Sequence, residues 1–212
     1  MTVINSQITA WEGDFGDAYT ERNMATEERV KQACAAFTEI LSRTDGAQPQ
    51  SILEIGANIG INLRALKRCT SASLFAVEPN AKAREVLVSD DVLPEECVYN
   101  GTTTNMHFAD ASIDLVFTSG VLIHVPTEDL EKSYREIYRV ANRYILSLEY
   151  FSPQPTTIQY RGHEDMLFKR DYGGLWMDMF DDLQPAGYGF FWKRLSGLDD
   201  VNWWLFRKPS PD

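Results

Sequence analysis

The feature that most constrains the fold is an alternation of short apolar runs with helical segments through the middle of the chain. The apolar runs are SILEIG (51–56), SLFAVE (73–78), IDLVFTS (113–119) and RYILSLEYF (143–151). A segment with helical spacing of its apolar residues follows each of the first three runs. Continuous apolar strands separated by helices predict a parallel sheet covered on both faces, in an α/β domain of the doubly wound type.

Both flanks of this region carry further elements. Residues 24–44 have apolar side chains on helical spacing, which predicts an amphipathic helix before the first strand. A short helix is also expected around residues 175–180. Two aromatic runs, 188–194 and 201–208, predict an antiparallel hairpin that closes one edge of the sheet. Ligands of such a sheet bind beyond the carboxyl ends of its parallel strands.

Composition narrows the expected partners and compartment. The 212 residues favour a single domain, and a formal charge of −11 disfavours binding to nucleic acid or to an anionic membrane. Cys34, Cys69 and Cys97 match neither a redox pair nor a zinc-ligand spacing, so we expect reduced thiols in the cytoplasm. We also expect no export signal, since the N-terminus lacks a basic region followed by an apolar one. We expect no membrane span, since no run approaches about 18 apolar residues.

The turn after the first strand, ILEIGANIG (52–60), has the chemistry of a ligand-binding loop. Gly56 can adopt a positive φ and admit a ligand to the backbone, while Gly60 lets the next helix begin close to the strand. Asn58 stands where dinucleotide-binding turns have a middle glycine, which disfavours a pyrophosphate. Glu54 would repel phosphate and attract an ammonium group, so a ligand with an amino-acid head is favoured over a nicotinamide dinucleotide.

A second carboxylate, Glu78, ends the second strand in FAVEPN (75–80) and can accept hydrogen bonds from ribose hydroxyls. Glu54 and Glu78 together describe a ligand that has an amino-acid head and a ribose but no phosphate. S-adenosylmethionine has these parts. The alternative is that the two carboxylates only cap or pair within loops.

With ILEIGANIG as a first motif, FAVEPN as a second and IDLVFTSGVLIHV (113–125) as a third, the sequence resembles the class I S-adenosylmethionine-dependent methyltransferases. The resemblance implies a Rossmann-like, doubly wound, mostly parallel seven-stranded sheet with an antiparallel C-terminal hairpin. It also implies S-adenosylmethionine as the cofactor, with Glu54 facing its amino group and Glu78 holding its ribose. The other core positions implied to bind the cofactor are Gly56, Gly60, Pro79, Gly101, Thr102, Thr118 and Gly120.

Longer stretches narrow the resemblance. They are WEGDFGDAYTERN (11–23), ILEIGANIGINLRALKR (52–68), GVLIHV (120–125) and YILSLEYFSPQPTTIQYRGHEDMLFKRDYG (144–173). These stretches are similar to the methylases associated with pseudaminic acid biosynthesis, and the similarity runs from about residue 11 to residue 206. It implies an N-terminal lid over the cofactor with Asp14, Tyr19 and Asn23 reaching inward, and Trp11 is a further candidate cofactor-binding residue. Alternatively, Trp11, Phe15 and Tyr19 form one helical face that packs against the sheet.

We therefore expect one domain with four segments. They are a helical lid at 1–45, a cofactor-binding core at 51–151, a substrate loop and helix at 152–185, and the hairpin at 186–208. A long loop just past a strand end is placed over the ligand crevice and is usually functional. Arg161 is the expected anchor for a substrate carboxylate, because its planar guanidinium binds one bidentately. The candidate substrate-binding residues are Tyr150, Tyr160, Arg161, Glu164, Asp165 and Arg170. A solvated, salt-bridged loop is the alternative.

Methyl transfer from a sulfonium needs in-line alignment and, for a hydroxyl or protonated amine acceptor, removal of a proton. His124, at the exit of the fourth strand, is the first choice for this base, with Glu149 and His163 as second choices. The alternative is that His124 only packs or caps. The three histidines are scattered and form no close ligand pair, so no metal is expected.

The favoured function is an S-adenosylmethionine-dependent methyltransferase that acts on a small polar metabolite, with a nonulosonic, pseudaminic-type sugar or its precursor as the favoured acceptor. One alternative is N-methylation of an amino-acid or guanidino substrate in a natural-product pathway, since Glu149, Glu164 and Asp165 can pair with a cation. Another is a non-catalytic module that keeps the cofactor fold. The sequence leaves the acceptor atom and the oligomeric state open.

Overall fold

The computed structural model describes residues 6–45, 48–160 and 163–209, and for residues 6 and 163–165 it describes the backbone alone. The strands of its central sheet are β1 (Ser51–Ile55), β2 (Ser73–Val77), β3 (Val98–Tyr99), β4 (Ile113–Ser119), β5 (Ala141–Glu149), β8 (Gln184–Phe191) and β9 (Val201–Arg207). Their order is β3-β2-β1-β4-β5-β9-β8. The first five strands in this order are parallel, and β9 runs antiparallel to both β5 and β8. The predicted α/β sheet with an antiparallel C-terminal hairpin is confirmed.

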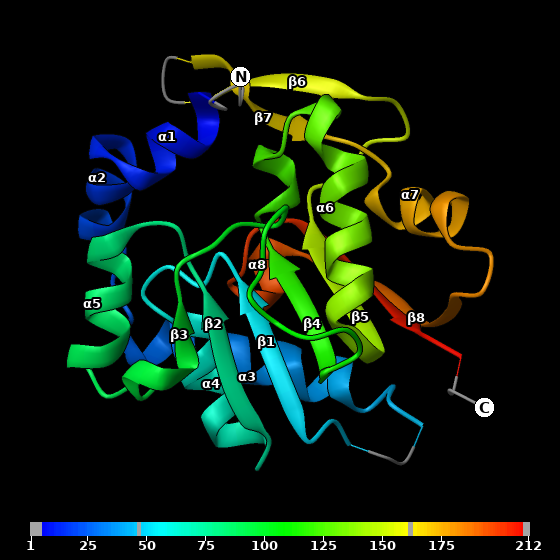
Figure 1. Ribbon diagram of the computed structural model, residues 1–212, viewed down its shortest axis with the longest axis horizontal. Helices are drawn as coiled ribbons and strands as arrows, with labels where there is room; N and C mark the ends of the chain where they lie inside the picture. Colours follow the sequence, from blue (N-terminus) through cyan, green and yellow to red (C-terminus); the bar gives the residue numbers. More distant parts are fainter. Residues whose placement is uncertain (1–5, 46–47, 161–162, 210–212) are drawn as a thin grey trace.

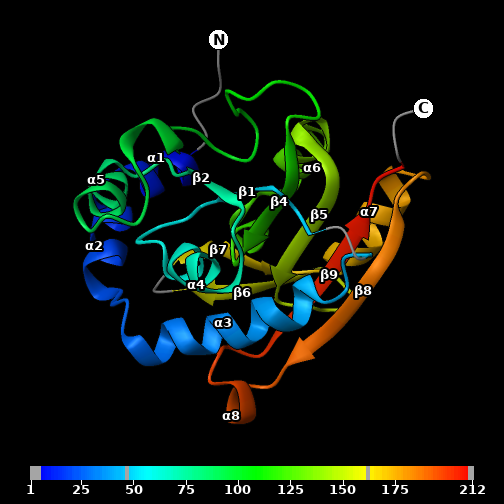
Figure 2. The same ribbon diagram turned by 90° about the horizontal axis from the view of Figure 1, so that it is seen from below.

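Helices cover both faces of this sheet. The helices on one face are α3 (Glu27–Leu41), α4 (Ile61–Cys69) and α5 (Ala81–Ser89), and those on the other are α6 (Thr127–Val140) and α7 (Tyr172–Met179). Figure 2 shows α3 and α4 on the side of the sheet opposite α6. Each face buries its own apolar cluster. Ile52 lies in the cluster beneath α3 and Leu53 in the cluster beneath α6, because successive strand residues point to opposite faces.

Side-chain caps fix where two of these helices begin. The Thr26 hydroxyl accepts a hydrogen bond from the Arg29 backbone N–H (3.3 Å), which caps α3. The Asn80 side-chain oxygen accepts one from the Ala83 N–H (2.8 Å), which caps α5 immediately after the second strand. The second cap holds the chain that follows Glu78 in a fixed path.

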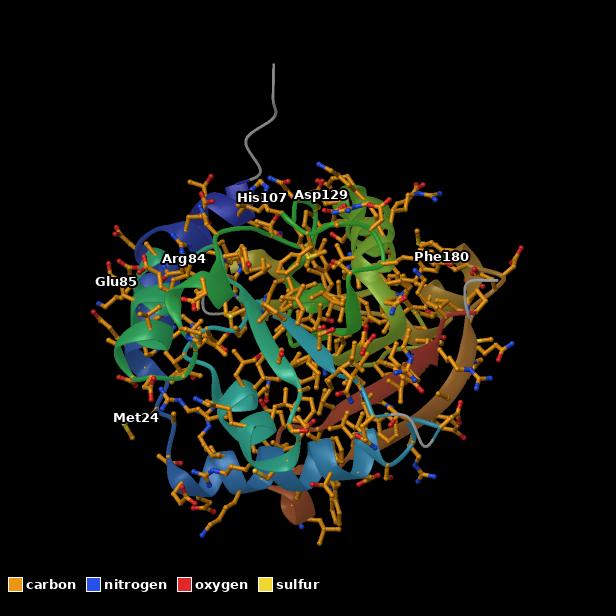
Figure 3. All side chains as sticks on the ribbon, turned by 60° about the horizontal axis from the view of Figure 1, so that its bottom comes forward. Met24, Arg84, Glu85, His107, Asp129 and Phe180 are labelled. Atoms are coloured by element: carbon orange, nitrogen blue, oxygen red, sulfur yellow. The ribbon has the colours of Figure 1, made fainter. Side chains whose placement is uncertain are left out.

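The N-terminal segment forms two helices, α1 (Ser6–Glu12) and α2 (Asp14–Arg22), separated at Gly13. They lie beside α5 at the end of the sheet where the parallel strands finish (Figure 1). The expected lid at 1–45 is therefore too long, because α3 buries its apolar face in the core instead of covering that end. The chain turns from α2 to α3 at Met24, whose side chain is 64% exposed and projects outward at this corner (Figure 3).

Residues 152–171, which we expected to form a loop, contain an antiparallel hairpin of β6 (Thr156–Tyr160) and β7 (His163–Lys169). The loop prediction was wrong because the charged residues of this segment mask a run of β-branched and aromatic residues, TTIQY. The hairpin lies across the carboxyl end of the sheet near α1 (Figure 1). Its position over the crevice agrees with the prediction, although its conformation does not.

Three short helices complete the described chain. They are the 3₁₀ helices η1 (Glu95–Cys97) and η2 (Leu122–His124), and α8 (Lys193–Ser196), which lies between β8 and β9. None of the described helices combines the length and the apolar character needed to cross a lipid bilayer.

Phe37 tests whether α3 belongs to the core. Its ring is 1% exposed and makes an edge contact with Phe117 at a centroid distance of 5.2 Å. Phe37→Ala should lower the free energy of unfolding by about 3–5 kcal/mol, the usual cost of deleting a buried phenylalanine. Chemical denaturation measures the change, with Glu39→Ala on the exposed face of α3 as the control. Equal, small effects of the two substitutions would contradict a core position for α3.

Candidate active site

A cavity of about 700 Å³ opens beyond the carboxyl ends of β1, β2, β4 and β5. Its volume lies within the range of small-molecule sites. The predicted site residues that line it are Trp11, Tyr19, Asn23, Glu54, Gly56, Glu78, Pro79, Thr102, Gly120, His124, Glu149, Tyr150 and Tyr160. Four predicted residues, Gly60, Gly101, Thr118 and Arg170, do not line it.

The turn between β1 and α4 has the backbone that its glycines predict. Gly56 has a φ of 73°, and a Cβ there would lie 2.5 Å from a methyl carbon of Val121. A side chain at Gly56 would therefore separate the two loops that meet at the cavity. Gly60 has a φ of 74° and caps α4, where a Cβ would lie 2.6 Å from Leu87. Gly60 thus permits close packing of the turn and does not face the ligand space.

Glu54 is 2% exposed at the end of β1. Its Oε1 accepts a hydrogen bond from the side-chain amide of Asn62 (2.7 Å), whereas its buried Oε2 has no partner among the described residues. Burial raises the pKa of Glu54 to about 8, and the nearby Glu78 adds to the rise. Glu54 lines the cavity, and an ammonium group placed against its carboxyl group would supply a hydrogen-bond donor and a compensating charge.

Glu78 is also buried, with 6% exposed, but both of its oxygens have partners. Oε2 accepts a hydrogen bond from the Asn58 backbone N–H (2.8 Å), and Oε1 accepts one from the Asn80 backbone N–H (2.9 Å). Burial raises the pKa of Glu78, and these two N–H groups oppose the rise. Each carboxylate oxygen keeps a second lone pair for a ligand hydroxyl, so the geometry suits the predicted ribose contact.

The third and fourth strands contribute fewer of the predicted residues. Gly101 packs against its own loop, since a Cβ there would lie 2.8 Å from the Asn105 carbonyl oxygen. Its neighbour Thr102 lines the cavity, as do Thr103 and Thr104. Thr118 is buried beside Glu149, behind the cavity wall. Gly120, with a φ of 66°, follows β4 and does line the cavity.

The N-terminal helices supply the outer wall of the cavity through an aromatic cluster. The Trp11 ring lies at centroid distances of 5.0 Å from Phe15 and 5.3 Å from Tyr19, so these side chains do share one face across the break at Gly13. Trp11 also contacts His124 (5.0 Å), and His124 contacts Tyr160 (5.3 Å). Aromatic side chains from α1, η2 and β6 thus form one cluster at the cavity.

His124 has a fixed tautomer. Its Nδ1 bonds to the backbone carbonyl oxygen of Met166, which can only accept, so Nδ1 carries the proton and Nε2 keeps a lone pair. Burial lowers the pKa of His124 to about 4, and the Met166 carbonyl opposes this effect. The ring is therefore neutral at physiological pH, which a proton acceptor requires.

Glu149 is fully buried at the end of β5, and its carboxylate holds η2 in place. Its oxygens accept hydrogen bonds from the backbone N–H groups of Val121 (3.2 Å), Leu122 (3.1 Å) and Ile123 (3.3 Å). Burial raises its pKa to about 7 despite these bonds. The arrangement gives Glu149 an anchoring role beneath the loop that presents His124.

The predicted substrate residues divide into three groups. Tyr150 and Tyr160 line the cavity, and the Tyr150 hydroxyl donates to the Asp199 carboxylate (3.1 Å). Arg170 is buried and donates to the Val125 carbonyl oxygen (3.1 Å) and the Thr127 hydroxyl (2.9 Å), so it ties the end of β7 to the junction between η2 and α6. Arg161 and the side chains of His163, Glu164 and Asp165 lie outside the described residues.

Several cavity residues were not predicted from the sequence. They are Asn62, which bonds Glu54, together with Asn58, Asn80, Val121 and Asp199. Asn80 carried a usable signal, because an asparagine two residues after a strand-end carboxylate and just before a helix is a capping position. Asp199 gave no such signal in the sequence. It lies in the loop before β9, and only the pairing of β9 with the sheet brings that loop to the cavity.

Residues 53–143 match the family model of a methyltransferase domain. The matched region runs from β1 into β5 and contains Glu54, Glu78 and His124. The match therefore covers the half of the sheet that forms the inner wall of the cavity.

The whole chain is similar in structure to several methyltransferases. A Leishmania major S-adenosylmethionine-dependent methyltransferase has 15% identity, with a TM-score of 0.71 over 96% of this chain and 87% of that one. Magnesium protoporphyrin IX methyltransferase from Synechocystis, solved with bound cofactor, has 10% identity and a TM-score of 0.69, over 99% and 100% of the two chains. Burkholderia thailandensis 1,6-didemethyltoxoflavin-N1-methyltransferase, solved with 1,6-didemethyltoxoflavin and S-adenosylhomocysteine, has 15% identity and a TM-score of 0.65, over 97% and 87%. At these identities the similarity concerns the fold.

The seven-stranded sheet and the methyltransferase domain within it define the class of this protein, an S-adenosylmethionine-dependent methyltransferase of class I. Its cofactor is S-adenosylmethionine. The residues present fit this cofactor, because the unpartnered oxygen of Glu54 suits an ammonium group and the doubly bonded Glu78 suits a ribose.

Proton release on cofactor binding tests the role of Glu54. With a pKa of about 8, the Glu54 carboxyl is mostly protonated at pH 7, and an adjacent ammonium group would lower that pKa and release the proton. We therefore expect S-adenosylhomocysteine to release up to one proton at pH 7, and its affinity to rise as the pH rises toward 8. Calorimetry in buffers of different ionisation enthalpy measures the release.

Two variants serve as references for that measurement. Glu54→Gln should abolish the Glu54 component of proton release, whereas Glu85→Gln, on the exposed side of α5 (Figure 3), should behave as the wild type. Equal proton release by the wild type and Glu54→Gln would show that the ammonium group binds elsewhere.

Proposed function

We propose that this methyltransferase acts on a small polar metabolite, and that a nonulosonic, pseudaminic-type sugar or a precursor of one is its first candidate acceptor. The observation that carries the proposal is the cavity itself, which lies between the cofactor carboxylates and a wall of Trp11, His124 and Tyr160. A volume of about 700 Å³ has room for one cofactor and a small acceptor. The sugar class rests on the sequence resemblance.

The charge of the cavity favours a second candidate acceptor, an amine or guanidine. Among the described residues, five carboxylates and one guanidinium line the cavity; they are Glu54, Glu78, Asp129, Glu149, Asp199 and Arg29. Once its carboxyl groups are ionised, such a lining attracts a cation and repels a carboxylate. An N-methyltransferase of an amino-acid or guanidino substrate is therefore the alternative, and the non-catalytic module is disfavoured by the neutral, oriented His124.

S-adenosylmethionine supplies an electrophilic methyl group on a sulfonium. The protein must align the acceptor with it, and positioning of this kind can lower a barrier by roughly 7–11 kcal/mol. We propose that the Nε2 atom of His124 accepts the proton that leaves the acceptor. The Met166 carbonyl keeps Nδ1 protonated, and Trp11 and Tyr160 exclude water from the ring.

Substitution of His124 tests this base. His124→Ala should lower the rate of methyl transfer by about 10²–10⁴, the usual contribution of a positioned base. His107→Ala, at an exposed histidine outside the cavity, is the matched control and should retain full activity. Because the His124 pKa is about 4, the wild-type rate should show no ionisation near pH 6.5. A loss below about tenfold would leave His124 a packing residue.

The acceptor class is tested by transfer of a labelled methyl group from S-adenosylmethionine into a size-fractionated extract of the source cells. Glu78→Ala is the blank, because loss of the ribose contact should greatly weaken cofactor binding. Label in the low-mass fraction, retained on an anion exchanger for a sugar acid or on a cation exchanger for an amine, would identify the class. Label confined to protein or nucleic acid would refute the proposed metabolite acceptor.

A further inference from the structure

Two asparagines join the cofactor carboxylate Glu78 to the N-terminal helices. Asn58 and Asn80 each give their backbone N–H to one oxygen of Glu78. The side chains of the same two residues point the other way and bond to α1, α2 and the residue after α2. One pair of residues therefore contacts both the proposed ribose site and the outer wall of the cavity.

The Asn58 side chain bonds to α2 and to the residue that follows it. Its Nδ2 donates to the Thr20 hydroxyl (3.1 Å), and its Oδ1 accepts from the Asn23 side-chain amide (3.1 Å). Asn58 has a φ of 46°, a conformation that asparagine adopts more readily than most residues other than glycine. Asn58, at the middle position of the turn, thus adopts the left-handed backbone conformation and adds a side chain that binds α2.

The Asn80 side chain bonds to the end of α1 and to α2. Its Nδ2 donates to the Trp11 carbonyl oxygen (3.2 Å) and to the Asp17 carboxylate (2.7 Å), while its Oδ1 caps α5. The approach is close, since a Cβ on Gly16 would lie 2.8 Å from this Nδ2 and 1.8 Å from the Trp11 carbonyl oxygen. The residue held in this way, Trp11, is the one whose ring contacts His124.

We propose that Asn58 and Asn80 are positioning residues that couple cofactor binding at Glu78 to docking of α1 and α2, an inference that rests on the proposed role of Glu78. A ligand that bonds to Glu78 fixes the carboxylate, the two backbone amides and the turns that carry both asparagine side chains. Docking of α1 and α2 fixes the same turns from the outside. Such a coupling is reciprocal, so each event strengthens the other by the same factor.

The coupling extends to the acceptor side of the cavity. Trp11 and Tyr160 complete the acceptor side of the cavity only when α1 is docked, and docking is strengthened by the cofactor. The cofactor and the acceptor therefore favour the same docked state of α1, so each should strengthen the binding of the other.

The test uses variants that interrupt the link without removing a group that holds the cofactor. Thr20→Val deletes the hydroxyl that accepts from Asn58 and alters no atom of the turn. Asn58→Gly keeps the backbone N–H and the left-handed conformation but removes the side chain. Thr44→Val is the matched control, because Thr44 is also buried and lies outside the cavity lining. Its hydroxyl donates to the Leu41 carbonyl oxygen and accepts from the Gln48 side-chain amide, so neither bond involves the N-terminal helices or the turns around Glu78. The measurements are S-adenosylhomocysteine affinity by calorimetry and backbone hydrogen exchange of residues 14–22, with and without this ligand.

In the wild type we expect S-adenosylhomocysteine to slow exchange in α2. Thr20→Val and Asn58→Gly should each speed exchange in α2 and weaken binding by about 5- to 150-fold, the usual range for coupled sites. The double variant should bind no more weakly than Asn58→Gly, because both substitutions break one link. Thr44→Val should match the wild type in both measurements.

Two results would overturn the coupling. One is a Thr20→Val protein that binds S-adenosylhomocysteine as tightly as the wild type. The other is wild-type exchange in α2 that the ligand does not change. Failure of the wild type to bind S-adenosylhomocysteine at all would instead refute the cofactor assignment, so the two failures are distinguishable.

Discussion

The burial of three carboxylates at one end of the sheet is the constraint on which the site depends. Glu54, Glu78 and Glu149 end three strands and are 2%, 6% and 0% exposed. A buried carboxylate is costly unless hydrogen bonds compensate it. Glu149 receives three backbone N–H groups, Glu78 receives two, and Glu54 receives one side-chain amide. The number of compensating hydrogen bonds is thus highest for Glu149, which shapes the loop, and lowest for Glu54, which we propose holds the ligand ammonium group.

The hydrogen bonds to these carboxylates also explain the conformations of the loops around the cavity. The N–H groups that satisfy Glu149 come from the start of η2, and this fixes the segment that presents His124. Those that satisfy Glu78 come from the turns after β1 and β2, which also receive the N-terminal helices. A charge placed inside the protein therefore organises backbone that lies far away in the sequence.

Much of the fold was predictable, because continuous apolar runs and helical spacing act over short distances along the chain. The positions of Glu54 and Glu78 at the cavity were also predictable, since Glu54 lies near the end of one recognisable strand and Glu78 directly follows another. The hairpin β6–β7 was missed because its β-branched run lies among charges, and the break at Gly13 was missed because the aromatic spacing passes through it. The bond between Asn80 and Asp17 joins residues 63 positions apart, and no local pattern encodes such a contact.

The strand order has a consequence for synthesis on the ribosome. β8 emerges before β9, yet its neighbour in the sheet is β9, which inserts between β5 and β8. Until residues 201–207 are made, β5 presents an unpaired edge and β8 has no strand to join, and unpaired edges are templates for association between chains. A nascent chain that stalls before Val201 therefore lacks β9 and leaves β8 unattached to the sheet. The core cluster that contains Trp203 is then incomplete.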